Sequence, residues 1–371
     1  MSQYTIHTDT LFDPKLKSFL SDVSITVETI SGSIVKVYRR TEALQNPVEA
    51  PDVDLRGKYV MPGDLGSESM QDADCNVRDA INRGLTPGPR LFVATDIITS
   101  TGTYEARTEN RVGGTRLPAL SDAADGTDEI IRAVRRRIAQ GADVIKFYAD
   151  YRRRAMRFPP TKGGGGGGPA TNEDIVAYSL EEMSALVAEA QRAGCPVAAH
   201  AASNAAVMLA ARAGALSIEH AYGADDETLR CVHDHGCILV PTLAVCEHLH
   251  RARMPAILAA TQRAWTMGIQ LACGGDTGAF PHGDNAREME LMVDAGIPVP
   301  DVLAACTLGG WKACGGDACG RRFGWLQAGT AADIIALDAD PRMDPQAMRK
   351  VSFVMKDAKV WKKDGVAVGM I

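Results

Sequence analysis

The chain has 371 residues, 46% of them hydrophobic, which is enough for one large domain and one small domain. Its formal net charge is −6 and no basic stripe runs along it, which argues against a nucleic-acid partner. No apolar run reaches the roughly 18 residues that span a bilayer, and the N-terminus lacks a signal-peptide pattern, so we expect a cytoplasmic protein that does not bind membranes.

The first 60 residues are predicted to form β-strands. The stretch 21–40, SDVSITVETISGSIVKVYRR, alternates β-branched with polar residues around a Gly-Ser turn, and VDLRGKYVMPG (53–63) adds a short strand. Short strands return near the C-terminus in ADIIALD (332–338) and VSFVMKDAKVWKKDG (351–365). We expect the strands from the two ends to pair in a small β-sandwich domain made of residues 1–62 and 325–371.

Helices and short apolar strands alternate from about residue 76 to residue 286. One helix, at 179–194, begins with a capping box, Ser179 followed three residues later by Glu182, and ends at Gly194. Such alternation is typical of a parallel sheet with right-handed crossovers. Because polar residues recur at the strand ends, where β/α barrels carry their catalytic groups, we predict an α/β fold with a TIM-like (β/α) barrel over residues 63–324. Six strands are predicted: PRLFVAT (89–95), DVIKFYA (143–149), PVAAHA (196–201), SIEHA (217–221), CILVPTL (237–243) and IQLACGGD (269–276).

Four polar residues end four of these strands: Lys146, His200, His220 and Asp276. A charged lysine in an apolar strand is costly to bury, and one known solution is reaction with carbon dioxide, which gives a carbamate that can bridge two metal ions. Imidazole and carboxylate are natural ligands of zinc-like ions. One such residue alone is more often a satisfied polar group of the core, but four at the same end of successive strands predict a metal site.

Matching pieces in the correct order resemble the amidohydrolase superfamily, in particular its prolidase-like and ochratoxinase-like branch. They are GKYVMPG, GADVIKFY, PVAAHA, GALSIEHA, GGDTG, HGDNAREMELMVDAGI and GWLQAGTAADIIALDADP, and together they cover nearly the whole chain. The resemblance implies hydrolysis of a C–N (amide or peptide-like) bond in a small molecule by a metal-activated water. It implies that Lys146 is the carboxylated bridging lysine, that His200 and His220 hold the second metal, and that Asp276 binds metal and acts as the general base. His282, in the next loop, resembles a substrate-contacting residue, and a plain loop histidine is the alternative.

The stretch VMPGDLGSESM (60–70) departs from the family pattern. Members of the family follow PG with a strand that ends in His-x-His and holds the first metal, whereas Glu68 and Met70 fall in that place here if no gap is allowed. The alternative alignment joins Gly63 directly to Asp64 across a deletion of the first βα unit and most of the second strand. It predicts an incomplete barrel whose unpaired edges favour a homo-oligomer, and one Zn²⁺ or similar ion instead of two.

Two other interpretations stay open. The chain is a degenerate member of the superfamily, repurposed as a lyase or cyclase of secondary metabolism or as a binding protein, or it is the unstable product of a mis-predicted coding sequence. Three further clusters are interpreted as structural: CVHDHGC (231–237), HLH (248–250) and CGGDAC (314–319). The nine cysteines have no regular spacing, which indicates free thiols. The cationic run 151–157 and the glycine run 162–169 are predicted to be loops, the second a mobile lid over the barrel rim.

Overall fold

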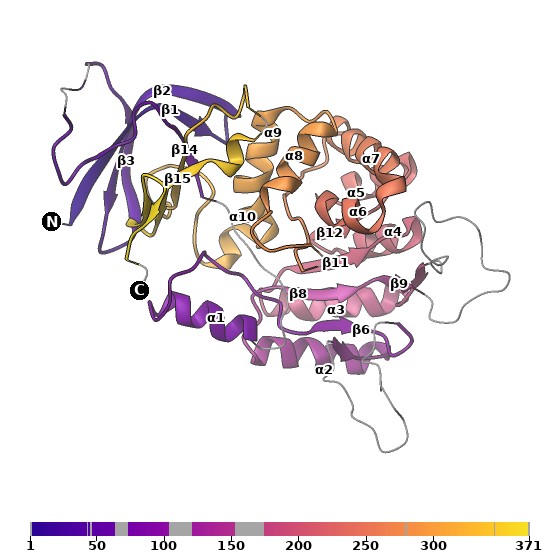
Figure 1. Cartoon of the computed structure of the whole chain (residues 1–371). Coiled ribbons are helices and arrows are strands. Elements are labelled where there is room, and N and C mark those ends of the chain that lie inside the picture. The colour runs from indigo at the N-terminus through magenta and orange to yellow at the C-terminus, as the bar shows by residue number, and fades with distance from the viewer. Residues whose placement is uncertain are drawn as a thin grey trace.

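The computed structural model describes residues 2–42, 44, 47–63, 73–103, 121–152, 174–278, 280–344 and 346–369. Three stretches singled out in the sequence lie wholly or mostly outside these ranges: 64–70, which holds Glu68 and Met70, the cationic run 151–157, and the glycine run 162–169. Within the described ranges the chain forms two large sheets, a two-stranded ribbon and a set of helices (Figure 1).

Strands from both ends of the chain lie in one nine-stranded sheet, which confirms the predicted pairing of the two ends. β14 pairs antiparallel with β5, so that Ile334 lies opposite Pro62, and β5 in turn pairs parallel with β1. The order is β17-β16-β15-β14-β5-β1-β2-β3, with β4 paired to β1. The strands are β1 (Gln3–Asp13), β2 (Ser18–Glu28), β3 (Ser33–Arg39), β4 (Val53–Asp54), β5 (Tyr59–Pro62), β14 (Ile334–Leu337), β15 (Val351–Lys356), β16 (Lys359–Lys363) and β17 (Val366–Ala367).

The second sheet has six strands in the order β13-β12-β11-β8-β6-β7, and all its pairings are parallel. This is the parallel sheet that the strand–helix alternation predicts. A separate antiparallel ribbon, β9 (Asp150–Arg152) with β10 (Asp174–Val176), follows β8. The parallel strands are β6 (Ile97–Thr99), β7 (Ser121–Ala123), β8 (Ile145–Tyr148), β11 (Val197–Ala201), β12 (Ser217–His220) and β13 (Ile238–Val240).

Helices cover the outside of the parallel sheet and separate it from the nine-stranded sheet (Figure 1). Helix α3 begins with the predicted capping box, because the Ser179 hydroxyl accepts the Glu182 N–H and the Glu182 carboxylate accepts the Ser179 N–H. The helices are α1 (Ala73–Asn82), α2 (Gly126–Ala139), α3 (Leu180–Arg192), α4 (Asn204–Ala213), α5 (Asp226–Asp234), α6 (Leu243–Leu249), α7 (Met254–Thr266), α8 (Ala286–Asp294), α9 (Val299–Ala304) and α10 (Gly310–Ala313), with a π-helical turn at Ala305–Gly309 and short 3-10 turns at Arg251–Arg253, Gly316–Cys319 and Ala347–Arg349.

The alternation of side chains along the parallel strands sets the position of the polar residues. In β8, Ile145 and Phe147 are fully buried in the core beneath the helices, whereas Lys146 between them faces the other side of the sheet. In β11, Ala199 is fully buried and His200 faces the same side as Lys146. Successive residues of a strand point to opposite faces, so the apolar residues bury one face while the polar ones gather on the other.

The structure differs from two of the predicted strands, 89–95 and 269–276. Residues 92–95 of the predicted strand 89–95 are irregular, and β6 follows at 97–99, because side chains satisfy this backbone: the Val93 N–H donates to Asp143 and the Thr95 N–H to Asp74. The segment 269–276 makes only one parallel bridge, Leu239 to Leu271. Strand β7 has no counterpart among the predicted strands.

Candidate active site

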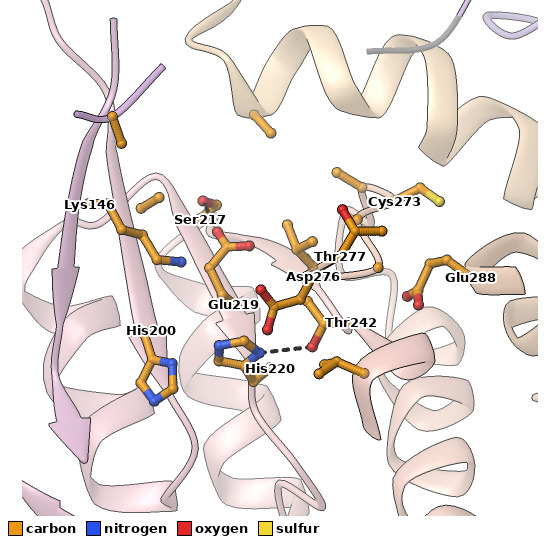
Figure 2. Close-up of a pocket in the computed structure, with 18 of the residues that line it drawn as sticks. Lys146, His200, Ser217, Glu219, His220, Thr242, Cys273, Asp276, Thr277 and Glu288 are labelled. Atoms are coloured by element: carbon orange, nitrogen blue, oxygen red, sulfur yellow. Dashed lines mark hydrogen bonds between the residues drawn. The ribbon is translucent and has the colours of Figure 1, made fainter. Parts of the chain in front are cut away.

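A cavity of about 490 Å³ is lined by residues of the parallel strands and of the segments at their carboxyl ends. Lys146 from β8, His200 from β11, His220 from β12 and Asp276 from the loop after the Leu271 bridge all line it (Figure 2). The structure therefore brings together the four side chains that the strand ends predict. His282 is exposed in the loop before α8 and is not part of the described lining of this cavity.

The two histidines are close enough to share an ion. Their ring centroids are 4.4 Å apart and the ring planes are inclined by 72°. Two histidines on one zinc ion, with bonds of about 2.1 Å and a tetrahedral angle, have ring centres about 5 Å apart. The donor pair of His200 and His220 thus suits a divalent cation.

The His220 ring is oriented by two hydroxyl groups. Its Nδ1 lies 2.8 Å from Thr242 Oγ1 and 3.0 Å from the Tyr222 hydroxyl, which leaves Nε2 for the cavity. Burial, together with the nearby His200 and Lys146, holds the pKa of His220 well below its ordinary value. A neutral imidazole with one nitrogen held by a hydrogen bond is the form that ligates metals.

The His200 ring lies beside an aromatic ring and a buried carboxylate. The Tyr148 ring meets it edge-on with centroids 4.4 Å apart, and Asp150 Oδ1 lies 3.7 Å from His200 Nε2. Asp150 is fully buried and accepts hydrogen bonds from the backbone N–H groups of Ala202 and Ser203. These hydrogen bonds tie Asp150 to the turn that directly follows the strand carrying His200.

Lys146 and Asp276 have opposite charges but no partner among the described residues: no hydrogen bond or ion pair involves the Lys146 amine or the Asp276 carboxylate there. Polar groups in a protein cavity are normally paired. Two charged groups that point into one cavity beside two imidazoles indicate a site that is completed by groups beyond the described residues.

Three residues at the strand ends have backbone angles that are uncommon for side chains other than glycine. The φ angles are 80° at His220, 51° at Thr242 and 58° at Asp276. Such left-handed conformations carry strain, and they concentrate at functional sites where a side chain must be aimed against the regular alternation of its strand. All three side chains line the cavity, so this strain serves to direct them into it.

The described residues do not supply a complete set of the side chains that commonly bind metal ions. No three His, Cys, Asp or Glu side chains in the described ranges are arranged to hold a metal ion. Structural and catalytic zinc sites take three or four protein ligands. Among the described residues, His200 and His220 are a donor pair that suits a metal ion, and Lys146, Glu219 and Asp276 line the same cavity.

A model of the amidohydrolase family matches residues 65–368. The chain belongs to the amidohydrolase family. The ochratoxinase of Aspergillus niger is 30% identical over 324 residues, a match that covers 79% of this chain and 64% of that protein. This amidohydrolase-family chain thus spans a little less than two thirds of the length of that curated relative.

Solved structures share the fold of this amidohydrolase-family chain. A Xaa-Pro dipeptidase with methionine bound in its active site is similar with a TM-score of 0.80 at 24% identity, over 97% of this chain and 100% of that chain. The structure of the A. niger ochratoxinase is similar with a TM-score of 0.81 at 22% identity, over 99% of this chain and 97% of that chain. The α/β fold and the superfamily expected from the sequence are confirmed.

Three cavity residues of this amidohydrolase-family chain were missed in the sequence: Glu219, Thr242 and Glu288. Glu219 has a signal, because it lies two residues after Ser217 on the inward face of β12, and the Ser217 hydroxyl donates to it at 2.6 Å. Thr242 and Glu288 have no local signal, since their roles depend on contacts between distant segments. His250, from the HLH cluster interpreted as structural, also lines the cavity. Its ring centroid lies 5.3 Å from the ring centroid of Tyr222.

Within the described ranges, every helix is too short or too polar to cross a lipid bilayer.

The cysteines are all free thiols, as their spacing predicts. His233 and Cys231 of the CVHDHGC cluster lie in α5, and no metal-binding group forms there among the described residues.

Glu288 of α8 is a buried carboxyl group at the edge of the cavity. It is 1% exposed, and its Oε1 has no hydrogen-bond partner among the described residues. Burial raises the pKa of Glu288 to about 8, and the Asp276 carboxylate adds to the rise. At neutral pH the group is therefore mostly protonated in the folded chain, in contrast to an ordinary glutamate.

This raised pKa predicts a stability that depends on pH. Between the ordinary value of 4.5 and about 8, folded Glu288 binds a proton that the unfolded chain lacks. The free energy of unfolding should therefore fall as pH rises through this window, by an amount on the order of a few kcal/mol for a fully buried group. Urea unfolding of the wild type and of Glu288→Gln at pH 5 and pH 8 measures it. The wild type should lose more stability than the variant, and equal losses would contradict the assignment.

Proposed function

We propose that this chain hydrolyses an amide-type C–N bond in a small molecule and that it uses one Zn²⁺ or similar divalent ion. The observation that carries the proposal is the convergence of Lys146, His200, His220 and Asp276 on one cavity, where Lys146 and Asp276 have no partner among the described residues. We propose that His200, His220 and the carbamate of Lys146 hold the ion. A divalent ion supplies a water of lowered pKa and a Lewis acid for the carbonyl group.

The side chains of the chain itself have separate tasks in this reaction. Asp276 accepts the proton of the attacking water and passes it to the leaving nitrogen, which is the work of a general base and then a general acid. The hydroxyl of Thr242 holds His220 Nδ1 at 2.8 Å, so that Nε2 stays directed at the cavity. His282 stays a predicted substrate contact, supported by its exposed position in the loop that follows Asp276.

The substrate class that best suits the cavity is an N-acyl amino acid or a dipeptide. The names of two relatives, an ochratoxinase and a Xaa-Pro dipeptidase, support this class. The lining of the cavity includes three tyrosines, Tyr148, Tyr151 and Tyr222, and Leu249. These side chains favour an aromatic or large apolar side chain on the substrate, because rings stack and bury apolar area against rings.

The two domains are also part of what we propose. We propose that residues 63–324 form an incomplete (β/α) barrel that lacks the first βα unit, and that residues 1–62 and 325–371 form the small β-sandwich domain. In support, no strand of the described ranges joins β7 to the segment at Leu271, at the two ends of the parallel sheet. Such open edges favour a homo-oligomer. We also retain the cytoplasm as the location, in line with nine free thiols.

Metal removal tests this function. Purified protein should hold about one equivalent of a zinc-like ion and hydrolyse some members of a panel of N-acyl amino acids and dipeptides. Dialysis against a chelator should abolish hydrolysis, and added Zn²⁺ should restore it. A folded protein that holds no ion and hydrolyses no member of the panel would support the non-hydrolytic alternative, a lyase, a cyclase or a binding protein.

A further inference from the structure

Helix α6 begins in an unusual way. Its N-cap residue is Thr242, a residue type whose hydroxyl normally accepts a hydrogen bond from the second or third N–H of the helix. Here the Thr242 hydroxyl makes no such bond: the residue has left-handed backbone angles, and its hydroxyl lies 2.8 Å from His220 Nδ1. The first N–H groups of α6 therefore need another acceptor.

Glu288 supplies that acceptor from a different helix. Its Oε2 accepts the N–H of Ala244 at 2.7 Å, 44 residues away in the sequence. Both residues are buried, so that water cannot take over this bond. The carboxyl group of α8 thus caps α6, and the hydroxyl of Thr242 is free for the histidine.

The same helix start also supports the turn that carries Asp276. The Val245 N–H donates to Gly275 O at 3.2 Å, so the first turn of α6 is bonded to the residue before Asp276. A Cβ atom at Gly275 would lie 3.4 Å from the Cβ of Ala244 and 3.7 Å from that of Glu288. The turn is therefore packed directly on the Ala244–Glu288 contact.

We propose that Glu288 is a positioning residue of the active site, which acts through α6 on His220 and Asp276 without touching the substrate. By satisfying the Ala244 N–H, it leaves the Thr242 hydroxyl to orient His220, and by packing on Gly275 it fixes the turn that presents Asp276. The inference rests on the proposed function for its catalytic meaning. Its structural core, the division of labour between Glu288 and Thr242, can be tested without metal or substrate.

Removing the carboxyl group should redirect Thr242. In Glu288→Leu, the unsatisfied N–H of Ala244 becomes the best partner for the Thr242 hydroxyl, because a buried N–H without an acceptor is costly. A crystal structure of metal-free Glu288→Leu should show Thr242 Oγ1 turned to the start of α6 and away from His220 Nδ1. If Oγ1 stays within hydrogen-bond distance of Nδ1, the proposal is overturned, whether or not the wild type is a hydrolase.

Metal affinity gives the second readout. Competition with a chelator should show zinc bound about 10–100-fold more weakly by Glu288→Leu than by the wild type, the range found when the partner of a metal-binding histidine is lost. Glu288→Gln, whose amide oxygen can still accept the Ala244 N–H, should recover most of that loss. Leu291→Ala, a change at another buried position of α8, controls for loss of stability and should leave zinc affinity unchanged.

A double variant tests the route of the effect. If Glu288 acts through Thr242, Glu288→Leu combined with Thr242→Val should bind zinc little more weakly than Thr242→Val alone. Fully additive losses would contradict that route. A wild type that binds no zinc would count against the proposed function, while the Thr242 geometry in the metal-free crystals would still decide the proposal about Glu288.

Discussion

His200→Ala and His220→Ala should each lose the bound metal ion and the hydrolytic activity together. Each change removes one of the two imidazoles whose ring centroids are 4.4 Å apart, and no other described histidine takes its place at this spacing. Loss of the hydrogen-bond partner of such a ligand already costs about 10–100-fold in metal affinity, so loss of the ligand itself should cost more than about 100-fold. Metal analysis after gel filtration and the hydrolysis assay measure the two effects.

The matched control for these variants is His248→Ala. His248 is an exposed histidine that stacks on Phe280 with ring centroids 5.5 Å apart, and the described lining of the cavity does not include it. Its removal should leave metal content and activity unchanged. Full activity in His200→Ala or His220→Ala, with the ion still bound, would contradict the role of the histidine pair.

Asp276→Asn should separate chemistry from metal binding. The change keeps the size of the side chain but removes the carboxylate that accepts the proton, and general-base catalysis contributes about 10²–10⁴-fold to a rate. We therefore expect kcat to fall by about that factor while KM changes little. Steady-state kinetics on the best substrate of the panel, together with metal analysis of the same sample, measure both quantities.

The control for Asp276→Asn lies in the next loop. Asp284 pairs with Arg349 across the surface and plays no part in the described lining of the cavity, so Asp284→Asn should leave kcat unchanged. An Asp276→Asn variant with nearly normal kcat would assign the proton transfer to another group. Glu219, whose side chain also lines the cavity, is then the residue to replace.

The gathering of Lys146, His200, His220 and Asp276 could be predicted because three of them lie in parallel strands and Asp276 lies in the loop after the Leu271 bridge. Alternation along β8 and β11 decides which face a side chain takes, and parallel strands end at the same edge of a sheet. The strand boundaries were harder, as the 89–95 segment shows. There the backbone N–H groups of Val93 and Thr95 donate to Asp143 and Asp74, which are distant in the sequence.

The supporting residues could not be predicted for the same physical reason. The sequence predicts an ordinary N-cap role for Thr242, and only the tertiary structure directs its hydroxyl to His220. Glu288 lies in the amphipathic pattern of α8, where a glutamate is usually solvated. Its burial and its bond to Ala244 depend on how α8 docks against α6.

The most direct test is a crystal structure of the zinc-loaded protein with an anomalous-difference map at the zinc edge. We expect one peak, about 2.0–2.1 Å from one nitrogen each of His200 and His220, with density for a carbamate on Lys146 beside it and the Asp276 carboxylate facing it. A map without a peak between the two imidazoles, or an unmodified Lys146 turned out of the cavity, would contradict the proposed metal site.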